Sequence, residues 1–192
     1  MRSQMSQLDR SLVTREFNTT IDIFSRLASY ALSKPMDVDF ELGVEDRQDD
    51  LAINDITSIA LSARRLIVAT NAVGVAKSTK FSVIRGNEKK DVSIWDILGV
   101  IIHNEFFDIV RTSAKQAIYT AAQNLDEYEL YKHIMDNYGR SFLPIALFRS
   151  DKSLSIIMEL HTFLKQLATV LMDIVSLCED SGVHISAIHD FG

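Results

Sequence analysis

The residues best suited to chemistry in this chain are His103 and Asn104, with Arg111 further along the chain. An imidazole can move protons near neutral pH, and a guanidinium stabilises the charge on a phosphate group. A His and Arg pair of this kind suits the cleavage of RNA. The alternative is structural, because His103 follows a very apolar segment and a histidine is stabilising at a helix C-terminus. We favour the structural role and keep the three residues as the candidate catalytic group.

Other kinds of catalytic or metal site lack the residues that they need. None of the five histidines stands three or four positions from another, the spacings at which helical side chains converge on a metal. The single cysteine, Cys178, falls on an apolar helical stripe, where thiols are usually inert. Residues 74–79 resemble the end of a phosphate-binding loop, but Asn71 and Ala76 stand where that motif requires glycine. We therefore predict no metal, no cofactor and no catalytic nucleophile.

A second candidate site is a cluster of basic residues. Residues 77–90 contain only one acidic residue, Glu88, and five basic ones: Lys77, Lys80, Arg85, Lys89 and Lys90. Such a cluster suits a phosphate backbone or an acidic partner. The alternative is a solvated loop whose charge balances an acidic stretch over residues 37–50, and we favour that interpretation.

Composition narrows the class of protein. The 192 residues carry 20 Lys and Arg against 26 Asp and Glu, and this net charge of -6 argues against a general nucleic-acid binder. The N-terminus has no apolar run typical of a signal peptide, and polar residues interrupt the apolar stretch 154–178, which argues against a membrane span. One cysteine forms no intramolecular disulfide. We therefore expect a cytoplasmic protein with a single domain over residues 1–192.

Several stretches predict helices from apolar residues spaced three and four positions apart. The main ones are residues 8–33, residues 50–71 with Gly74 closing them, and residues 157–178. The last has the most regular pattern, from Ile157 to Cys178, and we expect it to form the spine of a bundle. A further helix is expected after Ser93, whose hydroxyl can cap it, with Asp96 three residues later.

The other stretches are less regular. Residues 79–92 indicate a small extended or hairpin arm that includes Phe81 and Val83. Residues 105–122 fit a helix or, in their first half, a strand, and we favour the helix. We also expect a short helix, an acidic loop and a flexible tail, over residues 125–138, 37–50 and 182–192 respectively. The predicted fold is all-α, a single-domain bundle of five or six helices with a small arm near residues 79–92.

The stretch Ser93 to Asn104, SIWDILGVIIHN, resembles an apolar helix ending in Ile-Ile-His that we associate with the HEPN-like helical bundles. The resemblance implies a mostly helical, often dimeric protein, and many members are ribonucleases of toxin-antitoxin or antiviral systems. Only His103 and Asn104 carry over into a site. The chain departs from the active pattern of that superfamily, in which Arg precedes His by four to six intervening residues, because Arg85 stands eighteen positions before His103.

These observations favour a small helical interaction or regulatory protein without catalytic activity. Its expected partner is another protein or a second copy of the chain, with no membrane and no small-molecule cofactor. The alternative is a HEPN-like protein that binds or cleaves RNA.

Overall fold

The computed structural model describes residues 10–32, 44–85, 88–104, 106–110, 145–149, 155–182 and 185. The helices of this part are α1 (Arg10–Leu32), α3 (Val44–Ala69), α4 (Val73–Ser78), α5 (Ile94–Ile102) and α8 (Leu160–Asp180). The strands are β1 (Lys80–Arg85), β2 (Glu88–Ser93), β3 (Phe106–Val110), β4 (Ile145–Arg149) and β5 (Ser155–Glu159). Most of the described residues are helical, which confirms the helical character predicted from the sequence.

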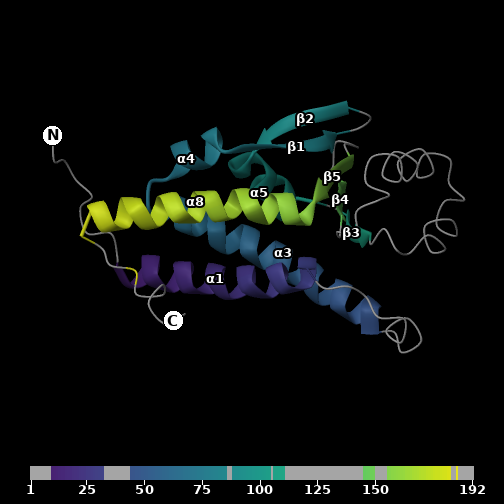
Figure 1. Cartoon of the computed structure of the whole chain (residues 1–192), viewed down its shortest axis with the longest axis horizontal. Helices are drawn as coiled ribbons and strands as arrows, with labels where there is room; N and C mark the ends of the chain where they lie inside the picture. Colours follow the sequence, from purple (N-terminus) through teal and green to yellow (C-terminus); the bar gives the residue numbers. More distant parts are fainter. Residues whose placement is uncertain are drawn as a thin grey trace, which may run out of the picture.

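The strands form one antiparallel sheet in the order β2-β1-β5-β4-β3. Its β1-β2 hairpin confirms the extended arm predicted near residues 79–92. The hairpin does not project alone, because Ile84 and Arg85 of β1 pair with Ile157 and Ile156 of β5. Figure 1 shows the hairpin running above α5 and α8, and the other three strands at one end of the long helices.

Two of our element assignments near the sheet are wrong. We favoured a helix at residues 106–110, where the structure has strand β3, so the strand alternative is confirmed there. Ile156 and Ile157 lie in β5, whereas we placed the start of the last helix at Ile157. Ile156 and Met158 are both buried, which is the period of two that a strand produces. Short apolar runs fit either structure, and pairing with distant strands selects the extended form.

Helix α3 differs from its prediction at both ends. It begins at Val44, so residues 44–50 of the expected acidic loop are helical. It ends at Ala69, and Asn71 follows with a positive φ of 56°. The Ala72 N–H donates to the Ile67 carbonyl at 2.8 Å, and the Asn71 N–H donates to Val68 at 3.1 Å. These two bonds form a Schellman motif, in which asparagine tolerates the left-handed conformation. Gly74, which we expected to close the helix, lies inside α4 instead.

Helix α5 begins as the sequence predicts. The Ser93 side chain accepts a hydrogen bond from the backbone N–H of Asp96 at 3.1 Å, and the Ser93 hydroxyl donates to the Asp96 carboxylate at 2.6 Å. Ser93 is itself buried. The cap therefore satisfies a backbone donor that the helix leaves unpaired.

We expect Ser93→Ala to lower the free energy of unfolding by about 1 kcal/mol, because the backbone N–H of Asp96 then loses the Ser93 hydroxyl that accepts its hydrogen bond. Chemical denaturation monitored by circular dichroism measures this change. Ser78→Ala is the matched control, because the exposed Ser78 hydroxyl only bonds a carbonyl of its own helix. An equal effect of the two substitutions would contradict the capping role of Ser93.

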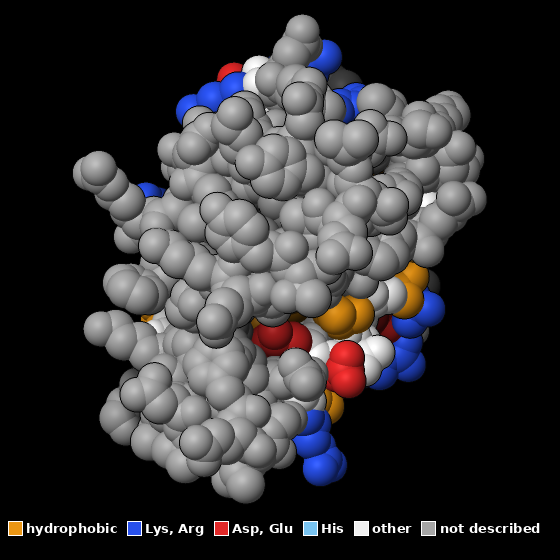
Figure 2. Space-filling view, turned by 90° about the vertical axis from the view of Figure 1, so that its right-hand side faces the viewer, with side chains coloured by type: hydrophobic (Ala, Val, Ile, Leu, Met, Phe, Trp, Pro, Cys, Tyr) orange, Lys and Arg blue, Asp and Glu red, His pale blue; other side chains and the backbone are white. Residues whose placement is uncertain are grey.

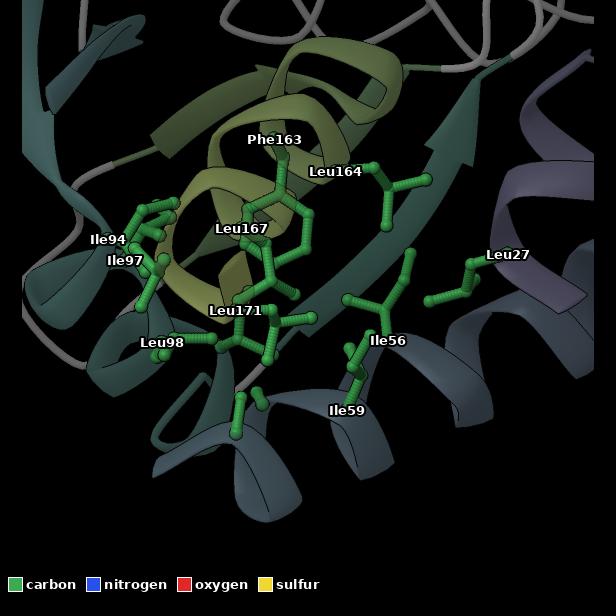
Figure 3. Packing of buried hydrophobic residues seen from close by; sticks show 14 of the residues in the cluster. Leu27, Ile56, Ile59, Ile94, Ile97, Leu98, Phe163, Leu164, Leu167 and Leu171 are labelled. Carbon is green, nitrogen blue, oxygen red and sulfur yellow. The ribbon is translucent and has the colours of Figure 1, made fainter. Parts of the chain in front are cut away.

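Helix α8 has one long buried face, which packs in the core. Figure 3 shows Ile56 and Ile59 of α3 pointing toward α8. On the other side, Ile94, Ile97 and Leu98 of α5 lie beside α8 in the same view. The buried stripe of α8 continues to the end of the helix and includes Phe163, Leu164, Leu167, Val170, Leu171, Ile174 and Cys178. Burial of this stripe contributes to the hydrophobic stabilisation of the fold together with the buried residues of α1, α3 and α5.

Among the described helices, α8 is long and apolar enough to cross a membrane by length and composition. The central helix of a folded domain meets the same criteria. The buried stripe of α8 packs on other elements, while His161, Lys165 and Asp173 on its remaining surface are exposed. This two-sided pattern is typical of a helix that packs in a domain core.

Helices α1 and α3 are joined by polar contacts as well as by their apolar faces. The buried hydroxyls of Thr20 and Ser62 lie 2.7 Å apart, and both bond the backbone carbonyl of Glu16. Nearer the surface, Arg26 binds both carboxylate oxygens of Asp55, at 2.8 and 2.6 Å. This contact raises the pKa of Arg26 through the hydrogen bond to Asp55. The contacts hold one side of α3 against α1.

Several predictions fall on residues outside the described part of the chain. They are the helical second half of residues 105–122, the short helix over 125–138, and the loop over 37–43. The tail over 182–192 is described only at Gly182 and Ile185, and Ile185 is buried.

Candidate functional site

His103 and Asn104 lie where the apolar helix α5 ends. His103 is the C-cap residue, its backbone N–H donates to the Gly99 carbonyl at 3.1 Å, and its side chain is exposed. The Asn104 side-chain amide donates to the carbonyl of Ile101. The His103 bond closes the last turn of α5, and the Asn104 bond satisfies the Ile101 carbonyl, which the end of the helix leaves unpaired. Arg111 lies outside the described residues, so the catalytic group of His103, Asn104 and Arg111 stays a prediction.

A cluster that the sequence analysis did not identify lies one helical turn earlier on α5. The guanidinium carbon of Arg64, on α3, lies 4.0 Å from the centre of the Trp95 ring. A Cβ atom placed on Gly99 would lie 2.9 Å from Nη1 of Arg64, so the glycine leaves the space that the guanidinium occupies. The stacked arrangement holds a cation at the partly exposed surface of α3 and α5. The four-residue spacing of Trp95 and Gly99 signals their shared face, but nothing local indicates Arg64.

We expect Gly99→Ala to displace Arg64 from Trp95 with little net change in stability. Alanine raises helix stability by about 0.5–1 kcal/mol, and loss of an exposed cation–π contact costs a similar amount. The fluorescence of Trp95, the single tryptophan of the chain, reports the displacement. Arg64→Ala should produce the same spectral change, whereas Arg65→Ala should not. An unchanged emission spectrum in Gly99→Ala would contradict the stacked geometry.

The five basic residues of the predicted cluster are all exposed: Lys77 on α4, Lys80 and Arg85 on β1, and Lys89 and Lys90 on β2. They do not share one surface. Lys90 stands opposite the buried Val83, and Lys89 occupies the next register position along the strand. Because neighbouring strand residues point to opposite faces, the charge is divided between the two faces of the hairpin.

The charged residues of strand β2 also fit its position, because β2 is an edge of the described sheet. Charged residues on an edge strand oppose pairing with another chain, and lysine is especially effective. Across the hairpin, the Ser82 hydroxyl donates a hydrogen bond to the Asp91 carboxylate at 2.6 Å. This bond fixes the position of one acidic side chain of β2. Figure 2 shows Lys and Arg side chains at the top of the molecule, where Figure 1 has the hairpin. This arrangement agrees with a solvated, charged edge.

The described residues contain no group of three or more His, Cys, Asp and Glu side chains that could hold a metal ion. Cys178 is a free thiol with no exposed surface, and burial raises its pKa. A thiol reacts as the thiolate, so both properties lower its reactivity.

The outer face of α3 is an exposed surface that carries several large apolar side chains. Three large apolar side chains on it are exposed: Leu51 by 59%, Leu61 by 40% and Val68 by 60%. The polar residues between them are exposed too, and together the positions follow a spacing of three and four: 51, 54, 58, 61, 65 and 68. We call these six residues the α3 stripe. It lies on the side of α3 opposite the buried Ile56 and Ile59.

Comparison with models of known protein families, with curated proteins and with solved structures found no match to this chain. The resemblance of residues 93–104 to the HEPN-like bundles therefore stays a prediction.

Proposed function

We propose that this largely helical chain is a non-catalytic interaction protein that binds a protein partner through the α3 stripe. The observation that carries the proposal is the alignment of Leu51, Leu61 and Val68 along one exposed helical face. Single exposed apolar residues are ordinary on a protein surface. A row of them at helical spacing is typical of a helix that packs on another helix.

The polar residues of the stripe suit a protein surface better than a buried core. Asn54, Ser58 and Arg65 lie between the apolar residues, so the face remains soluble before a partner binds. Interface surfaces combine apolar contacts with hydrogen-bonding groups, and Arg is enriched among them.

Affinity capture from cells of the source organism tests this function. Wild-type protein, Leu61→Glu and Met172→Glu serve as baits, and quantitative mass spectrometry compares what each retains. Met172, on α8, is 63% exposed, so its substitution introduces the same charge at an exposed apolar position away from the stripe. We expect a partner, this chain included, that Met172→Glu retains and Leu61→Glu loses by at least about tenfold. Equal capture by all baits would overturn the proposal.

RNA binding or cleavage is the second candidate function. The exposure of His103 and of the five basic residues on α4 and the hairpin favours it. Incubation of wild type and His103→Ala with end-labelled RNA at low salt tests both properties. Cleavage that the variant loses would establish a ribonuclease and replace the first proposal. A mobility shift that weakens steeply between low and physiological salt would establish contact with phosphates.

A further inference from the structure

We infer that the partner of the α3 stripe is a second copy of this chain, with the two α3 helices packed antiparallel. This inference rests on the proposed function and names its partner. The occupant follows from two properties of α3 itself: the symmetry of the α3 stripe and the distribution of charge along the helix.

The six positions of the α3 stripe are symmetric about a point midway between Ser58 and Leu61. When a second α3 is laid antiparallel about that point, Leu51 faces Val68 of the other copy, and Ser58 faces its Leu61. A two-fold axis repeats each contact, so the four outer apolar residues pair with one another at the two ends. The two Leu61 side chains flank the centre. All six residues of the α3 stripe are thereby used by a single self-complementary contact.

The polar positions also find partners in this register. Asn54 faces Arg65 of the other copy. The Asn54 side-chain nitrogen donates to the backbone carbonyl of Asp50 at 3.0 Å, which leaves its side-chain oxygen as an acceptor for a guanidinium. The Arg65 guanidinium of the other copy can therefore donate a hydrogen bond to the Asn54 side-chain oxygen across the contact.

Charge selects the antiparallel orientation. The first half of α3, residues 44–57, has five acidic residues and one basic residue, whereas residues 58–69 have two arginines and no acid. Not all of these charges reach the outer face, because Arg64 stacks on Trp95 and Asp55 binds Arg26. The exposed charged side chains described on α3 are Arg47, Asp50 and Arg65. An antiparallel pair brings Asp50 of each copy toward Arg65 of the other, whereas a parallel pair would bring like charges together. Asp50 and Arg65 are both exposed, and this register places them within about one helical turn of each other.

The oligomeric state tests the inference first. Sedimentation velocity over a range of concentrations should show a reversible dimer of the wild-type chain. Leu61→Glu should raise its dissociation constant by at least about tenfold, because the two new carboxylates meet at the axis. Met172→Glu, the matched control, should dimerise like wild type. Unchanged thermal unfolding at concentrations where each protein is monomeric excludes a loss of fold.

Disulfide trapping tests the register. We expect Leu51→Cys protein mixed with Val68→Cys protein to form a disulfide-linked dimer on mild oxidation. Neither variant should cross-link to itself, because equivalent positions lie about 25 Å apart along an antiparallel pair. In a parallel pair, each variant would cross-link to itself, and the mixture would form no disulfide between Leu51→Cys and Val68→Cys protein. Wild-type protein controls for the buried Cys178.

The outcomes separate this inference from the proposed function. A monomer at all concentrations, or a dimer that Leu61→Glu leaves intact, overturns the inference. If the protein is monomeric but captures a different partner, and this capture depends on Leu61, the proposed function holds and the inference of a homodimer does not. If no captured protein depends on Leu61 either, both are overturned.

Discussion

Phe163→Ala is expected to lower the free energy of unfolding by about 3–5 kcal/mol. Phe163 has no exposed surface, and its ring centre lies 6.3 Å from that of Phe81 on β1. Its removal leaves a cavity between α8 and the sheet and forfeits the aromatic contact. Urea denaturation followed by circular dichroism measures the change. Because domains of this size are stable by only about 5–15 kcal/mol, the effect removes a large share of the total.

Two further variants make this result interpretable. His161→Ala changes an exposed residue of the same helix and should alter stability by no more than about 0.5 kcal/mol. Phe163→Leu retains most of the apolar volume, so we expect it to lower the free energy of unfolding by about 1.5 kcal/mol. This variant replaces Phe163→Ala in the measurement if the alanine variant does not fold. Equal stability of Phe163→Ala and His161→Ala would contradict the central position of α8.

The Cys178 thiol is expected to react with a disulfide reagent at least about a hundredfold more slowly in the native protein than in the unfolded chain. It has no exposed surface, and burial raises its pKa above the ordinary value of 9.0, so less reactive thiolate is present at a given pH. The reaction with Ellman's reagent at pH 8, with and without denaturant, measures the ratio.

The same burial has a consequence for stability at alkaline pH. The folded state holds the thiol proton more tightly than the unfolded state does. Unfolding therefore releases a proton once the pH exceeds about 9, and the stability that Cys178 contributes falls as the pH rises further. Cys178→Ala removes this part of the pH dependence.

The Ser176→Cys variant in a Cys178→Ala background is the control for reactivity. Ser176 is exposed on the same turn of α8, so a thiol there should react in the native state nearly as fast as in the unfolded chain. If native Cys178 reacted as fast as this exposed thiol, the buried end of α8 would be wrongly assigned.

Local patterns are sufficient to predict the regular helices. The alternation of three and four in α1 and α8 predicts one apolar face on each helix, and each helix does bury one face in the structure, although in the second half of α1 that face is formed by Thr20, Ile23 and Leu27. The Ser93 cap is equally local, because its donor and acceptor stand three residues apart. The hairpin β1-β2 is predictable for the same reason, since its two strands are neighbours in the chain.

Strands β3, β4 and β5 depend on long-range pairing. Ile109 of β3 pairs with Ala146 of β4, and Ala146 pairs with Met158 of β5. Their apolar sequences fit a helix or a strand equally well, and the hydrogen bonds that decide between them come from distant residues. The candidate catalytic group shows the same limit, because the sequence identifies His103 and Asn104 but not what surrounds them.

The surfaces of α3 show most clearly what tertiary structure decides. Arg64 and Arg65 are adjacent and chemically identical, yet Arg64 stacks on Trp95 while Arg65 lies exposed in the α3 stripe. The periodicity of α3 predicts which residues can form its apolar face. It does not show that Leu51, Leu61 and Val68 stay outside the core. Packing against α1 and α5 decides that, because burial depends on which elements meet a face and not on the residues of the face alone.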